Sequence, residues 1–430
     1  MTKNNKKKKE KKIVKTRHRV ATWFARNFIY RPFWGWWAMA KNGVSRKQAK
    51  ELRKGGPYLI VSNHISNTDP VMITNAVRMP VYYVATEVIF SMGLISKLLT
   101  FFLKPFPKSK SQPDISTVRN MLQISKEGGN VGVFIEGNAT FNGALASMPE
   151  AIGKVALKMK RPILVMNFID LYLKIPRWAI KARHSKIRPR VEVKRVIPYE
   201  EYKDLSPEQI NDLIYKEIES SPYENVAPEQ SFTRKHMAES LHRLLFMCPN
   251  CHNVDQMHGH DELVCKACGF KATYDDKGYI NSSITGKQTL IEADARQVIN
   301  YEQYLDKNRE YKISLVARQV YILKQRRIRI GYCDFILDEN GIRLDLKSKV
   351  WQSNSEIIPF ETISAFACQG KYRVIVYLRG GFTRMFEFNK DVNTYKILLT
   401  LQILKQRNLY KNGLSPYKLV SEDPTKRLGL

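Results

Sequence analysis

Short apolar runs alternate with stretches of helix-like periodicity between residues 57 and 168, and this alternation constrains the fold more than any other feature. The runs have the length of strands, and the stretches between them have the spacing of helices. The runs are YLIVS (58–62), VYYVA (81–85), VGVFI (131–135) and PILVMNF (162–168), and the helix-like stretches are 88–103, 115–126 and 150–160. Strands that alternate with helices predict an α/β domain in which helices flank a largely parallel sheet.

The first apolar run leads directly into NHISNTDP, residues 63–70. Ligand sites in open parallel sheets lie beyond the carboxyl ends of the strands, and His64 lies at such an end. A neutral imidazole there can accept a proton from an alcohol, and Asp69 can fix its tautomer and stabilise the imidazolium. A structural interpretation stays open, because Asp69 followed by Pro70 is also a good helix start and His64 can be an ordinary polar residue.

The third run leads into EGNATFNG, residues 136–143, at a second predicted strand end. A carboxylate, two glycines, two amides and a hydroxyl follow one another in this segment. The glycines permit close backbone approach, and the amides and Thr140 can hold a polar headgroup. The alternative interpretation is a plain turn, since glycine and asparagine are typical of turns.

Together the two motifs resemble the glycerolipid acyltransferases typified by 1-acyl-sn-glycerol-3-phosphate acyltransferase. The histidine-four-residues-aspartate signature is matched by NHISNTD, the Glu-Gly block is partly matched by FIEGNAT (134–140), and the apolar block led by proline is matched by PILV (162–165). The resemblance covers roughly residues 20–245 and rests on the order and spacing of three blocks. It implies an O-acyltransferase of phospholipid biosynthesis that moves a fatty acyl chain from acyl-CoA or acyl-carrier protein to a hydroxyl of a lysophospholipid.

The resemblance also assigns roles to individual residues. His64 is expected to act as the base and Asp69 to orient it. Substrate binding is expected from Asn63, Lys108, Lys110, Glu136, Gly137, Asn138 and Thr140. The family's arginine in the Glu-Gly block is Ala139 here, and only Lys108 or Lys110 can stand in for its second-block arginine. Both arginines are associated with the acceptor phosphate, so these departures concern the identity of the acceptor.

Two CxxC pairs follow this region, Cys248 with Cys251 and Cys265 with Cys268, separated by thirteen residues. This is the spacing of a zinc ribbon, in which each pair supplies two thiolates to a tetrahedral ion. Four cysteine ligands leave no open position, so we expect structural Zn²⁺. The nearby His252, His258 and His260 are read as loop residues rather than ligands, and redox chemistry of the pairs is the weaker alternative.

Beyond residue 311 the pattern changes to short strands closed by one amphipathic helix at 394–406. The strands are ISLVARQVYIL, IRIGYCDFIL, IRLDL, ISAFAC, YRVIVYL and TRMFEF. This pattern resembles a PH-like or GRAM-like domain, a β-rich fold. Residues 199–246 are expected to be helical and polar. The predicted domains are a basic arm and aromatic membrane-interface segment (1–45), the acyltransferase domain (46–246), the zinc ribbon (247–285) and a linker with the PH-like domain (286–430).

A formal net charge of +31 requires an anionic partner, but charge alone does not choose between lipid and nucleic acid. Lysines and arginines between 3 and 19 precede a segment rich in tryptophan and phenylalanine, which suits the headgroup layer of a membrane. Few cysteines and no recognisable signal peptide indicate the cytoplasmic side. We therefore expect a peripheral or monotopic protein on the cytoplasmic face of the membrane. Its expected partners are the anionic membrane surface, a lysolipid acceptor and an acyl donor, and nucleic acid is not expected to be one. The alternatives are a nucleic-acid-binding zinc-ribbon protein and a catalytically inactive lipid-binding scaffold.

Overall fold

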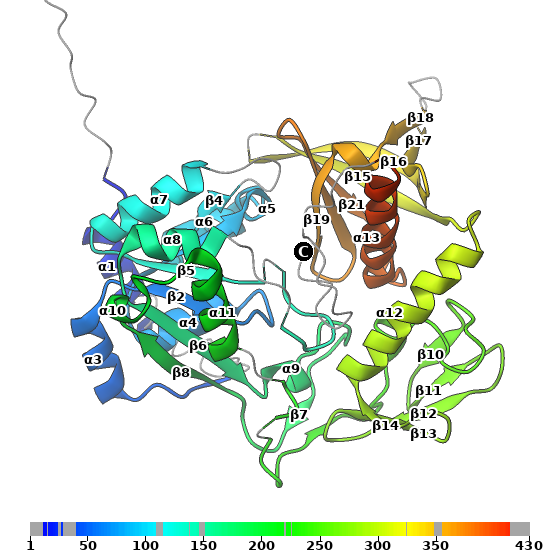
Figure 1. The fold of residues 1–430 in the computed structure, drawn as a ribbon, viewed down its shortest axis with the longest axis horizontal. Coiled ribbons are helices and arrows are strands. Elements are labelled where there is room, and N and C mark those ends of the chain that lie inside the picture. The colour runs from blue at the N-terminus through cyan, green and yellow to red at the C-terminus, as the bar shows by residue number, and fades with distance from the viewer. Residues whose placement is uncertain are drawn as a thin grey trace, which may run out of the picture.

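Strands and helices alternate through the first half of the computed structural model, and antiparallel strands dominate the second half (Figure 1). The structure describes residues 12–14, 16–24, 27–28, 40–108, 115–136, 138–145, 151–218, 221–224, 226–323, 325–347 and 355–412. Most of the predicted basic arm and aromatic segment lies outside these residues, as do Lys110 and Gly137 of the predicted site.

The first sheet has seven strands in the order β1-β8-β6-β2-β5-β3-β4. Their bounds are Lys41–Asn42 (β1), Leu59–Ser62 (β2), Val81–Thr86 (β3), Phe106–Lys108 (β4), Asn130–Phe134 (β5), Ile163–Ile169 (β6) and Arg190–Ile197 (β8). All neighbouring pairs are parallel except β6 with β8. The largely parallel sheet is therefore confirmed, and the four predicted strands correspond to β2, β3, β5 and β6.

Helices cover both faces of this sheet, which explains why its central strands are apolar throughout (Figure 1). The helices are Thr16–Phe24 (α1), Arg46–Gly55 (α3), Asp69–Val77 (α4), Glu87–Phe90 (α5), Leu94–Phe102 (α6), Ile115–Lys126 (α7), Ala151–Met159 (α8), Leu171–Lys174 (α9), Tyr199–Tyr202 (α10) and Pro207–Ile218 (α11). On β2, Ile60 packs in one core cluster with residues of α3 and α4. Leu59 and Val61 pack in the opposite cluster with residues of α7, α8 and α11.

Two expectations for this half were wrong. The stretch 88–103 is not one helix: α5 ends at Phe90 and α6 begins at Leu94, with Gly93 between them at φ +62°. A left-handed glycine interrupts the helical path, so the chain turns there. The expected helical region 199–246 ends at Ile218, and Pro222 and Pro228 follow within a segment of turns. Strands β1, β4 and β8 were not predicted.

The cysteine pairs lie in a small module of antiparallel strands, in the order β10-β11-β12-β13-β14. Its strands are Met257–Gly259 (β10), Glu262–Cys265 (β11), Lys271–Tyr274 (β12), Tyr279–Ser282 (β13) and Gly286–Thr289 (β14), and the preceding chain contains His184–Ser185 (β7), Phe232–Thr233 (β9) and Leu241–Arg243 (η2). Helix α12, Leu290–Lys307, follows at once and was not predicted. Thr289 and Glu292 form a capping box at its start, a sequence signature of a helix N-terminus.

The C-terminal sheet also has seven strands, in the order β18-β17-β16-β15-β21-β20-β19, and all its pairs are antiparallel. The strands are Ile313–Leu323 (β15), Arg326–Asp338 (β16), Gly341–Lys347 (β17), Ser355–Ile358 (β18), Ile363–Gln369 (β19), Arg373–Leu378 (β20) and Thr383–Glu387 (β21). Helix α13, Thr394–Lys411, packs against the sheet (Figure 1). The predicted succession of strands closed by one helix is present, with β18 as an additional strand, and its assignment as PH-like stays a prediction.

One hydrophobic cluster connects the cysteine module, α12 and the C-terminal sheet, and it extends to Phe141 and Trp178 of the first half. Asp294 of α12 lies at this junction and is 1% exposed. Its carboxylate accepts hydrogen bonds from Asn142 Nδ2 (3.0 Å), Tyr395 Oη (2.5 Å) and Gln297 Nε2 (3.1 Å). Burial raises the pKa of Asp294 to about 7, against the opposing effect of these three donors.

Asp294 should make the stability of the protein depend on pH. It binds its proton more tightly in the folded protein than in the unfolded chain, where its pKa is near 3.8. Raising the pH from about 4 to about 7 should therefore lower the free energy of unfolding by about 3 kcal/mol, with a small further loss as the pH rises past the folded pKa. Thermal unfolding midpoints across this range should show a weaker slope in Asp294→Asn. The exposed control Asp391→Asn should keep the wild-type slope, and an unchanged slope in Asp294→Asn would contradict this account.

Candidate active site

His64 and Asp69 come together at the carboxyl end of β2. Asp69 is the first residue of α4, and the chain between them turns back so that His64 Nδ1 lies 2.9 Å from Asp69 Oδ2. The Asp69 side chain is fully buried, whereas that of His64 is 16% exposed. The predicted helix start is present, with Pro70 in the first turn, but the N-cap is Thr68 and not Asp69. The Asp69 carboxylate contacts the imidazole instead.

The Asp69 carboxylate is held in place by the turn that precedes it. Its Oδ2 accepts the backbone N–H groups of Ile65 (2.7 Å) and Ser66 (2.9 Å), and its Oδ1 accepts the Ser66 hydroxyl (2.6 Å). A buried carboxylate can only accept these bonds, so the proton shared with His64 belongs to Nδ1. Nε2 of His64 then carries the free lone pair, and among the described residues it has no hydrogen-bond partner. This is the tautomer that a general base requires.

The second predicted motif holds the backbone of His64 from both sides. Glu136 Oε1 accepts the His64 N–H at 2.6 Å, and the Thr140 N–H donates to the His64 carbonyl at 3.0 Å. The imidazole also stacks on Phe134, the last residue of β5, with ring centroids 4.4 Å apart. Two motifs that are seventy-two residues apart in the chain therefore fix one histidine. Glu136 is 2% exposed, and its contact with a substrate stays a prediction.

The other predicted substrate-binding residues make contacts within the protein. Asn63 Oδ1 accepts the Phe168 N–H at 3.0 Å and so connects the ends of β2 and β6. The Thr140 hydroxyl bonds inside its own loop, donating to the Ala144 carbonyl and accepting from the Gly143 N–H. Asn138 lies in the same loop. Lys108 ends β4, at the same edge of the sheet but three strand positions from β2. Their contacts with a substrate stay predictions.

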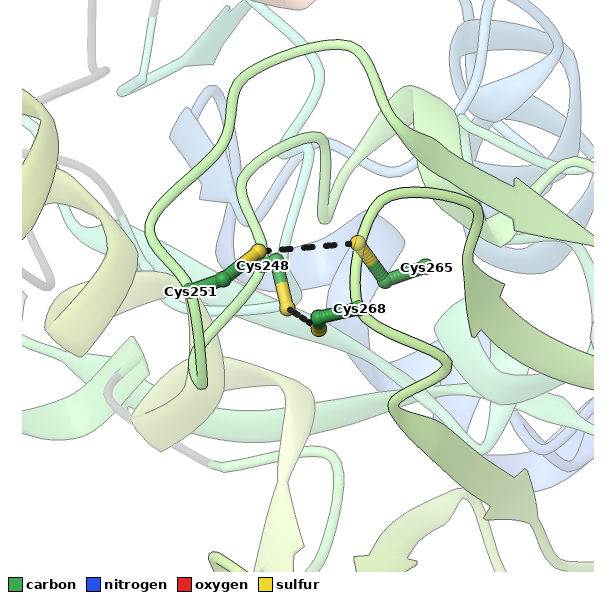
Figure 2. Close-up of side chains that lie close together, drawn as sticks. All are labelled: Cys248, Cys251, Cys265 and Cys268. Atoms are coloured by element: carbon green, nitrogen blue, oxygen red, sulfur yellow. Dashed lines mark hydrogen bonds between the residues drawn. The ribbon is translucent and has the colours of Figure 1, made fainter.

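The four predicted metal ligands converge in the cysteine module, as Figure 2 shows. Cys248 Sγ lies 3.6 Å from Cys268 Sγ, Cys251 Sγ lies 3.8 Å from Cys265 Sγ, and all four sulfurs lie within 4.8 Å of one another. Four thiolates at about 2.3 Å from a tetrahedral zinc ion are about 3.8 Å apart, so the arrangement fits this ion. His260 lies elsewhere, with its ring stacked on His236 beside Asp261.

Comparison with known proteins gives a family match over part of the chain. Residues 43–168 match the family model described as Acyltransferase. This stretch is therefore similar to the acyltransferase family. A solved structure similar to the chain is that of the 1-acyl-sn-glycerophosphate (LPA) acyltransferase PlsC from Thermotoga maritima, with 16% sequence identity and a TM-score of 0.31 over 47% of this chain and 91% of that chain. None of the curated proteins compared with the chain matches it.

The matched stretch contains His64, Asp69, Glu136 and Thr140, and it ends before the cysteine module begins. Another residue at this site, Arg177, lies beyond the match and was not predicted. Its guanidinium donates to the Ala139 carbonyl and to the Cys368 carbonyl of β19, and it lies 4.1 Å from the centre of the Phe141 ring. No local sequence motif marks this arginine, because its contacts are all with residues distant in the chain.

Proposed function

We propose that this protein is an O-acyltransferase that moves a fatty acyl chain from acyl-CoA or acyl-carrier protein to a hydroxyl of a lysophospholipid. The observation that carries the proposal is the buried Asp69 carboxylate on His64 Nδ1, inside the stretch that matches the acyltransferase family. This arrangement leaves Nε2 as the proton acceptor for an alcohol.

The reaction needs one base and no covalent enzyme intermediate. Nε2 of His64 takes the proton of the acceptor hydroxyl while the hydroxyl oxygen attacks the thioester carbonyl of the donor. The tetrahedral intermediate then collapses: the carbon–sulfur bond breaks, and the thiolate leaves with the proton from the imidazolium. Throughout, Asp69 stabilises the positive charge on the ring, and Glu136 and Thr140 keep the backbone of His64 in place.

His64→Ala should abolish acyl transfer, because a general base contributes roughly 10² to 10⁴ in rate. Asp69→Asn should remove most of the rate as well, since an amide cannot accept from the imidazole and the turn in the same way. The assay is transfer of a labelled acyl group from acyl-CoA to a panel of lysophospholipids. His184→Ala is a suitable control, because this exposed histidine lies in β7, which pairs with β9 in a separate two-stranded sheet. Wild-type turnover in folded His64→Ala would refute the mechanism.

The acceptor is where the chain departs from the related acyltransferases. Ala139 cannot form the bidentate, charge-assisted contact that an arginine makes with phosphate, and Lys108 offers only a point charge. We therefore propose that the enzyme prefers acceptors with a terminal phosphomonoester only weakly, and that it also accepts lysolipids with substituted headgroups.

The corresponding measurement compares kcat/KM for lysophosphatidic acid, lysophosphatidylglycerol and a monoacyl glycolipid. The wild type should prefer lysophosphatidic acid by much less than a hundredfold, and Ala139→Arg should increase that preference. Ala144→Arg places the same charge elsewhere in the loop and is the matched control. A hundredfold preference in the wild type, a difference of about 2.7 kcal/mol in transition-state binding, would show that the missing arginine is irrelevant.

We also propose that the enzyme works at an anionic membrane surface, as a peripheral protein on the cytoplasmic face. Within the part of the chain that the structure describes, no helix has the length and apolar character needed to cross a bilayer. The proposal is supported by the contact between α1 and α6, both of which expose large apolar side chains. Trp23 is 55% exposed, Phe101 is 56% exposed and Leu94 is 72% exposed. Such residues, with the basic charge of the chain, suit binding to anionic headgroups.

A structural zinc ion is proposed for Cys248, Cys251, Cys265 and Cys268. Metal analysis of protein purified under reducing conditions should find one zinc per chain. Cys268→Ser should lower that content and destabilise the module, because structural zinc contributes on the order of 10 kcal/mol to the folding of small domains. Cys333→Ala is the control, since this buried cysteine lies in β16 away from the cluster. Protein that contains no zinc would contradict the proposal.

A further inference from the structure

One peptide group connects the backbone of His64 to the C-terminal sheet through Arg177. The N–H of the Ala139–Thr140 peptide donates to the His64 carbonyl, and the C=O of the same peptide accepts from Arg177. The second arm of the guanidinium donates to the Cys368 carbonyl at 2.7 Å. A continuous series of hydrogen bonds therefore runs from the backbone of His64 to β19 of the C-terminal sheet.

Arg177 is well placed to act as a fixed bridge. It follows α9 and the buried Pro176, and its guanidinium lies over the Phe141 ring. A planar guanidinium presents several donors in a rigid fork, so it can hold two carbonyls in different directions at once. Hydrogen bonds from a charged donor are stronger than neutral ones.

A second connection holds the other end of the same loop. Asn142 donates to the buried carboxyl of Asp294 in α12, and Asp294 also accepts from Tyr395 of α13. The Phe141 ring packs on Tyr395 with centroids 4.8 Å apart. The loop 138–145 is thus fixed to β19, α12 and α13, all of which lie outside the stretch that matches the acyltransferase family.

We propose that Arg177 is a positioning residue for acyl transfer, and that the C-terminal sheet is thereby a working part of the active site. This inference rests on the proposed function for the identity of the reaction. Without Arg177, the Ala139 carbonyl loses its charged donor, and the Thr140 N–H is held less firmly against the His64 carbonyl. The ring of His64 then samples orientations in which Nε2 no longer faces the hydroxyl, and such misplacement lowers kcat.

The test uses the full-length protein with Arg177→Met, Arg177→Lys and the control Arg243→Met. Arg243 makes the same kind of contact with the C-terminal half, donating to the Lys390 carbonyl beside the Tyr372 ring. Arg177→Met should lower kcat by tenfold or more and speed hydrogen exchange of the peptide covering 138–145. Arg177→Lys should recover part of the rate, because an ammonium can still reach one carbonyl. Arg243→Met should change kcat and exchange in this loop less than twofold.

The proposal is overturned if Arg177→Met leaves either kcat or hydrogen exchange of the 138–145 peptide unchanged. It is also overturned if Arg243→Met lowers kcat as much as Arg177→Met does. Unfolding midpoints, measured in parallel, separate a local change from global destabilisation. If the wild type transfers no acyl group, the proposed function has failed instead. Hydrogen exchange then still decides whether Arg177 holds the loop.

Discussion

The hydrogen bonds on the backbone of His64 are the interaction on which the site depends. A strand end offers unpaired backbone groups, and here both groups of one residue are bonded by a segment that follows the neighbouring strand. The Asp69 carboxylate completes the arrangement by binding the ring and the turn that precedes α4. The backbone and the side chain of His64 are thereby each held by their own partners, and both sets of contacts are needed to keep a general base in one productive orientation.

Much of this could be predicted from the sequence, for a physical reason. In a parallel sheet the carboxyl ends of adjacent strands lie at one edge, so motifs that follow strands β2 and β5 must meet wherever those strands pair. The central strands could be recognised in the sequence because helices cover both faces of the sheet, and such strands are apolar on both sides. The contact between Glu136 and the His64 N–H could not be read from the sequence, because the family resemblance gives Glu136 an acceptor-binding role and implies nothing about a bond to the backbone.

The rest could not be predicted, because it depends on contacts between residues that are remote in sequence and carry no motif. Arg177 is an isolated arginine until the fold brings the Ala139 and Cys368 carbonyls beside it. Strand β8 has polar residues at most outward positions, since it lies toward an edge of the sheet and pairs antiparallel with β6. Helix α12 begins with a capping box, but its amphipathic pattern stands in a segment that reads as a linker.

The position of Asp294 shows what kind of connection joins the two halves. A buried carboxyl contributes less to stability than an apolar residue of similar volume, because its desolvation opposes its hydrogen bonds. The same desolvation raises the pKa of Asp294 to about 7. The carboxyl instead fixes the orientation of its neighbours, because the donors of Asn142, Gln297 and Tyr395 must all point at it. Apolar packing around Phe141 is non-directional, whereas these hydrogen bonds and the two on Arg177 each require a donor and an acceptor in fixed positions. The position of the loop that supports His64 is therefore set by polar contacts that tolerate little displacement.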